Sequence, residues 1–64
     1  MAHADILKIF ERMFRNYSGA RIIAWFPNGR NSIRIRHINK REYIFTYHGP
    51  SDWKFETVES FLKK

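Results

Sequence analysis

The sequence predicts a small α+β domain in the order α-β-β-β-α, in which helices cover one face of an antiparallel three-stranded meander. Three observations carry this prediction: an N-terminal segment with helical periodicity, a middle region rich in β-branched and aromatic residues, and short turn signals that divide it. The helices must cover one face, because three strands cannot hide an apolar face alone. The chain of 64 residues is expected to form a single domain, 1–64.

The N-terminal segment has the apolar stripe of an amphipathic helix, with charged residues on the opposite face. Ser18-Gly19 is expected to end this helix, with Gly19 in the left-handed conformation that follows many helices. An isolated helix of this length is marginal in water, so we expect the stripe to dock on the sheet. The stripe consists of Ile6, Phe10, Met13 and Tyr17.

Three segments with β-branched and aromatic residues predict strands at 21–26, 32–36 and 42–47. Asn28-Gly29 lies between the first two segments and is the strongest short-range signal for a hairpin. A second turn is expected at 39–41, so the three strands should form a meander.

The C-terminal segment has two interpretations. Residues 53–56 alternate between apolar and charged side chains, which favours a short fourth strand there. The alternative is the first turn of a longer helix capped by Ser51 or Asp52. In the favoured interpretation Thr57 caps the last helix and Glu59 lies in its first turn. The apolar stripe of that helix comprises Val58, Phe61 and Leu62.

A two-residue turn at Asn28-Gly29 also predicts the register of the first hairpin. It places Trp25 opposite Ser32, so that Trp25 shares one face of the sheet with Arg34 and Arg36. The opposite face is then apolar and should face the core. Its residues are Ile22, Ala24, Ile33 and Ile35.

The third strand has an aromatic phase, and the need for a core favours that phase inward. A slip of one residue in the second turn would reverse it and place Tyr43 and Phe45 beside the arginines. The residues expected to be buried together are Phe10, Phe14, Ile22, Ile33, Ile35, Phe45, Val58, Phe61 and Leu62.

The positive charge is concentrated in one part of the chain. The net charge is +6, and the segment from Arg12 to Arg41 carries eight cations and no Asp or Glu. Seven of these cations are arginines, which favour planar, bidentate contacts with phosphate or carboxylate groups. A basic segment without acidic residues is a candidate footprint for a polyanion.

We therefore predict a small basic nucleic-acid-binding protein, for DNA or RNA, that contacts mainly the phosphate backbone. Arginines pair with phosphates, and aromatic rings stack on bases. The predicted binding residues are Trp25, Arg30, Arg34, Arg36, Lys40 and Arg41.

The alternative is a non-enzymatic adaptor or inhibitor that docks on an acidic protein surface. Its contacts would be Trp25 and the arginine-rich segment, because Trp and Arg are enriched at the energetic centres of protein interfaces. Ile23 and Ile44 would extend Trp25 into an apolar patch. The same patch would also suit a homodimer.

Several classes of function are not expected. The chain has no cysteine, and its histidines and serines lack the spacings of metal sites or nucleophile elbows. No enzyme activity, metal or cofactor is therefore predicted. No apolar run approaches the ~20 residues of a membrane span, and no secretory signal is recognisable. A cytoplasmic protein without membrane contact is the expectation.

The order α-β-β-β-α is similar to that of double-stranded RNA-binding domains. The likeness covers the order of elements only. The Gly-Pro-x-His stretch of that family's first hairpin and its Lys-Lys-rich second-helix start have no counterpart in this sequence.

Overall fold

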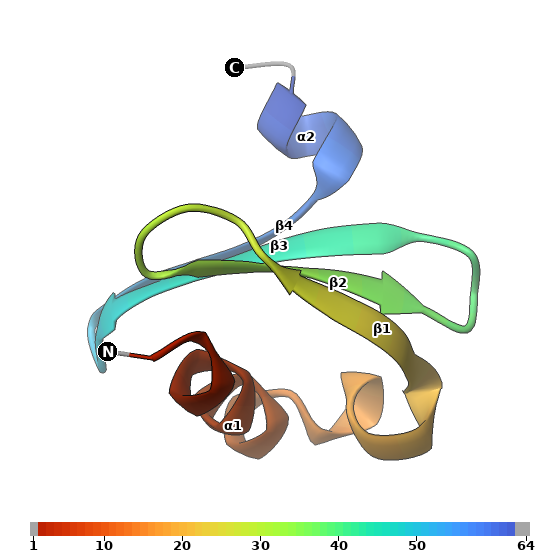
Figure 1. Ribbon diagram of the computed structural model, residues 1–64, viewed down its shortest axis with the longest axis horizontal. Coiled ribbons are helices and arrows are strands. Elements are labelled where there is room, and N and C mark those ends of the chain that lie inside the picture. The colour runs from red at the N-terminus through yellow and green to blue at the C-terminus, as the bar shows by residue number, and fades with distance from the viewer. Residues whose placement is uncertain (1, 63–64) are drawn as a thin grey trace.

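The computed structural model describes residues 2–62 as a four-stranded antiparallel sheet between two helices (Figure 1). The strands lie in the order of the chain, so each neighbouring pair is a hairpin. The fourth strand confirms the extended interpretation of residues 53–56. The helical elements are α1 (His3–Met13), the 3-10 turns η1 (Arg15–Tyr17) and η2 (Gly19–Arg21), and α2 (Val58–Leu62). The strands are β1 (Ile22–Pro27), β2 (Ser32–His37), β3 (Glu42–Gly49) and β4 (Asp52–Thr57).

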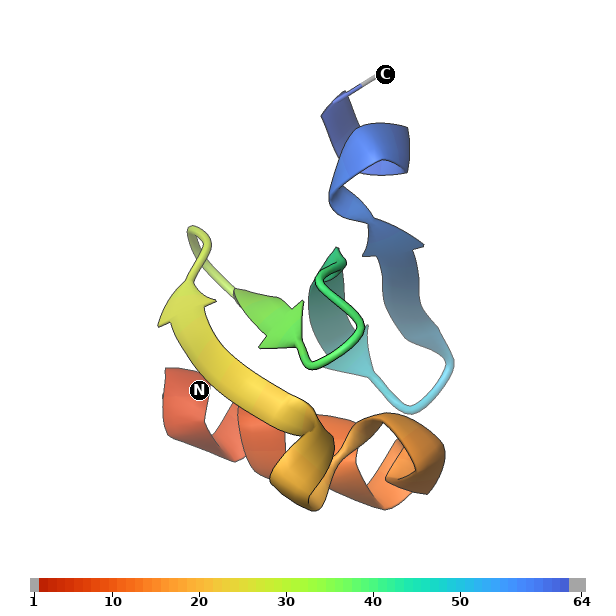
Figure 2. The ribbon, with the colours of Figure 1, turned by 90° about the vertical axis from the view of Figure 1, so that its right-hand side faces the viewer.

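The two helices lie on opposite sides of the sheet. Figures 1 and 2 show α1 beneath the sheet and α2 above it, beyond the end of β4. We call the side that faces α1 the inner face and the other side the outer face. The prediction that both helices cover one face is therefore wrong, although the α+β class and the meander are confirmed.

The inner face and α1 enclose a core that is centred on Phe10. The Phe10 ring is fully buried, and its centroid lies 5.3 Å from the centroids of both Phe45 and Phe55. Phe14 and Ile22 are partly buried and pack against the same cluster. These contacts confirm the predicted docking of the helix on the sheet. The fully buried cluster consists of Ile6, Phe10, Ile33, Ile35 and Phe45.

Helix α1 ends at Met13, earlier than the predicted stop at Ser18-Gly19. Phe14 leaves the helical region with φ −126° and ψ 66°, and the Ser18 hydroxyl donates a hydrogen bond to its carbonyl at 2.8 Å. The early end brings the Phe14 ring to 4.5 Å from the Phe55 ring, between centroids. Aromatic packing therefore outweighs continuation of the helix. Gly19 has the predicted positive φ, 69°, but it lies in η2.

The C-terminal helix does not join the core, in contrast to the prediction for Val58, Phe61 and Leu62. Phe61 is 39% exposed and Leu62 is 73% exposed. Thr57 begins the helix as predicted, because its side-chain oxygen accepts a hydrogen bond from the Ser60 backbone N–H at 3.1 Å. The inner face is already filled by α1 and by aromatic side chains of β3 and β4. Consequently α2 lies on the outer side, beside β3 and β4.

The first hairpin has a three-residue loop rather than the predicted two-residue turn. The Asn28 N–H donates a hydrogen bond to the Ser32 carbonyl at 2.9 Å, which leaves residues 29–31 as the loop. Asn31 adopts φ 60°, a left-handed conformation that Asn tolerates well. The register thus differs by three residues from the prediction, and Trp25 pairs with Ile35 instead of Ser32.

A register change by an odd number of residues moves side chains to the other face of a sheet. Trp25 therefore lies on the inner face and packs against the core, while Ala24 and Phe26 move to the outer face. A bulge between Ile22 and Ala24 keeps Ile22 on the inner side despite this change. The second hairpin turns at residues 38–40, one residue before the predicted 39–41, and it pairs Phe45 with Ile33. The aromatic phase of β3 points inward as predicted.

We expect Phe10→Ala to unfold much of the protein. Removing a buried Phe typically costs about 3–5 kcal/mol, and a domain of this size has about 5 kcal/mol in total. Urea unfolding followed by circular dichroism measures this loss. Met13→Ala is the control, because Met13 lies on the same helix but is exposed. Equal stability of the two variants would show that α1 does not dock through Phe10.

Candidate nucleic-acid interface

Strand β2 carries two arginines of the basic segment on one face of the sheet. Its side chains alternate, so Ile33 and Ile35 point into the core while Arg34 and Arg36 point to the outer face. The two arginine side chains are 44% and 52% exposed. They lie about 7 Å apart along the strand, because each residue of an antiparallel strand rises about 3.4 Å. The structure thus brings together two of the predicted site residues.

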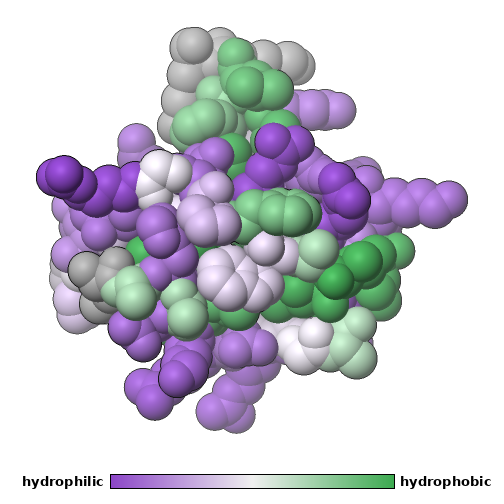
Figure 3. All heavy atoms as spheres, in the orientation of Figure 1, coloured by the Kyte–Doolittle hydropathy of each residue, from purple (hydrophilic) through white to green (hydrophobic). Residues whose placement is uncertain are grey.

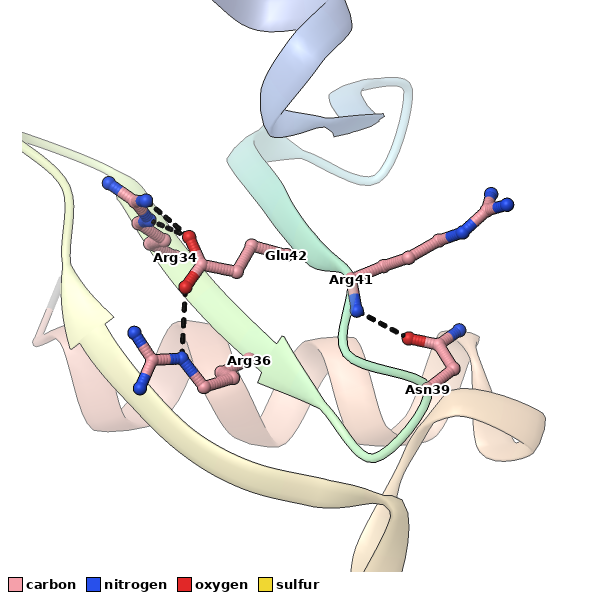
Figure 4. A network of polar contacts seen from close by, with 5 residues as sticks. All are labelled: Arg34, Arg36, Asn39, Arg41 and Glu42. Carbon is pink, nitrogen blue, oxygen red and sulfur yellow. Dashed lines mark hydrogen bonds and ion pairs between the residues drawn. The ribbon is translucent and has the colours of Figure 1, made fainter.

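Glu42 bridges the two arginines from the start of β3, directly opposite Arg36 (Figure 4). Its Oε1 accepts hydrogen bonds from Nε of Arg34 at 2.8 Å and from Nη2 of the same guanidinium. Its Oε2 accepts a hydrogen bond from Nε of Arg36 at 2.9 Å. One carboxylate therefore orders both cations, and the two terminal nitrogens of Arg36 lie outside the ion pair.

The bridge keeps Glu42 ionised. The hydrogen bonds from Arg34 first, and from Arg36 next, hold the pKa of Glu42 below its ordinary value. At neutral pH the three groups therefore carry two positive charges and one negative charge. Glu42 was not among the predicted site residues. A turn at the predicted residues 39–41 would have paired it with Ile38, whereas the observed register places it opposite Arg36.

Phe26 takes the position that the sequence analysis assigned to Trp25. It pairs with Arg34 across β1 and β2, on the outer face, and is 43% exposed. The guanidinium carbon of Arg36 lies over the Phe26 ring, 5.9 Å from its centroid. This distance is within the range of a cation–π contact. An exposed aromatic ring therefore adjoins the bridged arginines.

The remaining predicted residues lie at the two ends of β2. Arg30 is exposed in the loop before the strand, and Lys40 and Arg41 are exposed in the turn after it. Lys40 has φ 70°, and the Arg41 N–H donates a hydrogen bond to Oδ1 of Asn39 at 2.8 Å. Figure 4 shows the Arg41 side chain pointing away from Glu42. The cations therefore follow β2 from end to end.

Helix α2 and its surroundings occupy the other half of the outer face. A pocket beside β3 and β4 is lined in part by Thr46, Lys54 and Phe61, and Ile44 is buried on this side. Figure 3 shows the apolar side chains of α2 as a group at the top of the molecule. The exposed surface with arginines is therefore the half formed by β1 and β2.

The apolar patch considered for a protein partner does not form. Trp25 packs against the core on the inner face, Ile44 is buried, and Ile23 is exposed at the bulge of β1. The register of the first hairpin separates Trp25 from the arginines, and Ile44 is too deeply buried to contact a partner.

Within residues 2–62, no three His, Cys, Asp or Glu side chains gather closely enough to hold a metal ion. In that part of the chain no helix has the length and apolar character needed to cross a bilayer.

No protein-family model, no curated protein and no solved structure matches this chain. The likeness to double-stranded RNA-binding domains is limited further by the fourth strand, which changes the order of elements to α-β-β-β-β-α. Function is therefore argued from the side chains on the outer face.

The bridge predicts a specific dependence of stability on pH. Because the folded-state pKa of Glu42 is lowered, its ion pairs stabilise the protein above the ordinary pKa, and this stabilisation is lost as the pH falls through the lowered value. Glu42→Gln should therefore lower the midpoint of thermal unfolding at neutral pH and weaken its decline on acidification. Thermal scans between about pH 7 and pH 2 measure both effects. Glu11→Gln on α1 is the control and should retain the decline, whereas an unchanged decline in Glu42→Gln would contradict the role of the bridge.

Proposed function

We propose that this protein binds nucleic acid, mainly through phosphate contacts from the arginines along β2. The observation that carries the proposal is the bridged pair of Arg34 and Arg36 on the exposed half of the outer face. Guanidinium groups bind phosphates in a planar, bidentate manner. Glu42 holds the guanidinium groups of Arg34 and Arg36 in fixed positions. Ordering before binding reduces the entropy that is lost when phosphates are bound.

The charge along β2 supports a polyanion rather than a single small anion. Five cations lie along the strand or at its ends. Glu42 bridges two of them, and Glu59 of α2 lines a pocket with Lys40 and Arg41, so the balance of these seven groups is +3. A strand of six residues spans about 20 Å. Charges distributed over that length match a ligand with repeated negative charges, such as a nucleic-acid backbone.

Docking on an acidic protein is the alternative function. It would use the same arginines, because carboxylates and phosphates share the geometry that guanidinium recognises. It lacks the predicted anchor, since Trp25 packs against the core. Protein interfaces of useful affinity depend on such aromatic anchors more than on exposed charges. Nucleic acid is therefore the better-supported ligand.

The test compares two double variants that lose the same charge. Arg34→Gln with Arg36→Gln removes the bridged pair, and Arg12→Gln with Arg15→Gln removes two exposed cations from α1 and η1. For about 4–6 phosphate contacts, the logarithm of the binding constant should fall with the logarithm of salt concentration at a slope near −4 to −5. Arg34→Gln with Arg36→Gln should make the slope shallower by about 2. Arg12→Gln with Arg15→Gln should leave the slope closer to that of the wild-type protein.

Fluorescence titrations with labelled single- and double-stranded DNA and RNA measure these slopes. Thermal unfolding of each variant confirms that the fold is retained. If wild-type protein binds none of the four nucleic acids at about 50 mM salt, or if the two double variants lose affinity equally, the proposed role of the arginine pair is wrong.

A further inference from the structure

We propose that the ligand is single-stranded and that Phe26 is the platform on which one of its bases stacks. This inference rests on the proposed function, and it adds the class of nucleic acid and the residue that selects it. The observation that supports this inference is the exposed Phe26 ring, which lies beside the Arg36 guanidinium that Glu42 holds in place.

Phe26 differs from most aromatic residues near the core in having no aromatic neighbour. The rings of Phe10, Phe14, Phe45 and Phe55 pack against one another on the inner face. Among the described residues, Phe26 makes no ring–ring contact, and its ring interacts with the guanidinium of Arg36. A large apolar side chain that is 43% exposed on an open face offers surface to a ligand.

Arg36 links the ring to the phosphate-binding groups. Its guanidinium lies over the Phe26 ring, and Glu42 holds its Nε, so the position of the cation relative to the ring is restrained from two sides. Because Arg36 lies over one face of the ring, a base would stack on the other face, with its attached phosphate near the terminal nitrogens of Arg36. Aromatic rings and arginines combine in this way in proteins that bind single strands.

The ring discriminates between single and double strands. In a duplex the faces of the bases are hidden in the stack, and a protein reaches only the base edges and the backbone. A single strand has unstacked bases whose faces are available to an aromatic side chain. Duplexes would therefore contact the arginines alone, whereas single strands would contact the arginines and Phe26.

A second copy of this chain is the competing occupant, because β1 is an edge strand of the sheet. Two copies paired through this face would bring together two surfaces that carry the same excess of positive charge, in a chain of net charge +6. Like charges at an interface oppose association, whereas a polyanion neutralises them. Charge complementarity therefore favours the nucleic acid.

The experiment uses fluorescence anisotropy with an oligonucleotide in single-stranded form and annealed to its complement. Phe26→Leu removes the aromatic face but keeps an apolar side chain. Phe61→Leu is the matched control, because Phe61 is exposed to a similar extent, 39%, but lies on α2. Phe26→Trp tests rescue by a larger ring. Thermal unfolding of each variant confirms the fold.

We expect Phe26→Leu to weaken single-strand binding about 10-fold, in line with the contribution of one stacked base, and to leave duplex binding and the salt slope unchanged. Phe61→Leu should bind like wild type, and Phe26→Trp should bind at least as well. Equal loss for single strand and duplex, or no loss in Phe26→Leu, overturns this inference while the arginine-based function stands. A wild-type dimer in sedimentation that Phe26→Leu dissociates would assign the ring to a second copy instead. Absence of binding to either form would refute the proposed function as well.

Discussion

The alternation of side chains along β2 is the constraint on which the rest of the structure depends. A strand sends successive side chains to opposite faces, so Ile33 and Ile35 enter the core while Arg34 and Arg36 reach the outer face. Because β2 is paired on both sides, with β1 and with β3, its phase also determines which of their residues are buried. One strand thus supplies both the centre of the core and the charged surface.

The small size of the domain explains why that surface stays exposed. A chain of 64 residues has enough apolar side chains to fill one side of its sheet, and α1 with the aromatic rings does so. The second helix has five residues and lies beside β3 and β4 only. Within residues 2–62 no element covers the outer face over β1 and β2, which is where the bridged arginines and Phe26 lie.

Local patterns were sufficient for the strands, the inward aromatic phase of β3 and the shared face of Arg34 and Arg36. They were insufficient where packing between distant segments decides the outcome. Asn-Gly favours a two-residue turn, but a three-residue loop lets Trp25 rather than Ala24 reach the core. Similarly, the helical stripe continues past Phe14, yet the helix stops because that ring packs against β4. The orientation of α2 was also unpredictable, since it depends on the inner face being full.

The register of the first hairpin tests the account most directly, because it places Phe26 beside the arginines and Trp25 in the core. Cross-strand nuclear Overhauser effects in the NMR spectrum of the wild-type protein report this register without any substitution. We expect backbone contacts between Trp25 and Ile35, and between Phe26 and Arg34. Contacts between Trp25 and Ser32 would contradict this register, because they would turn Phe26 inward and remove the aromatic ring from the arginine surface.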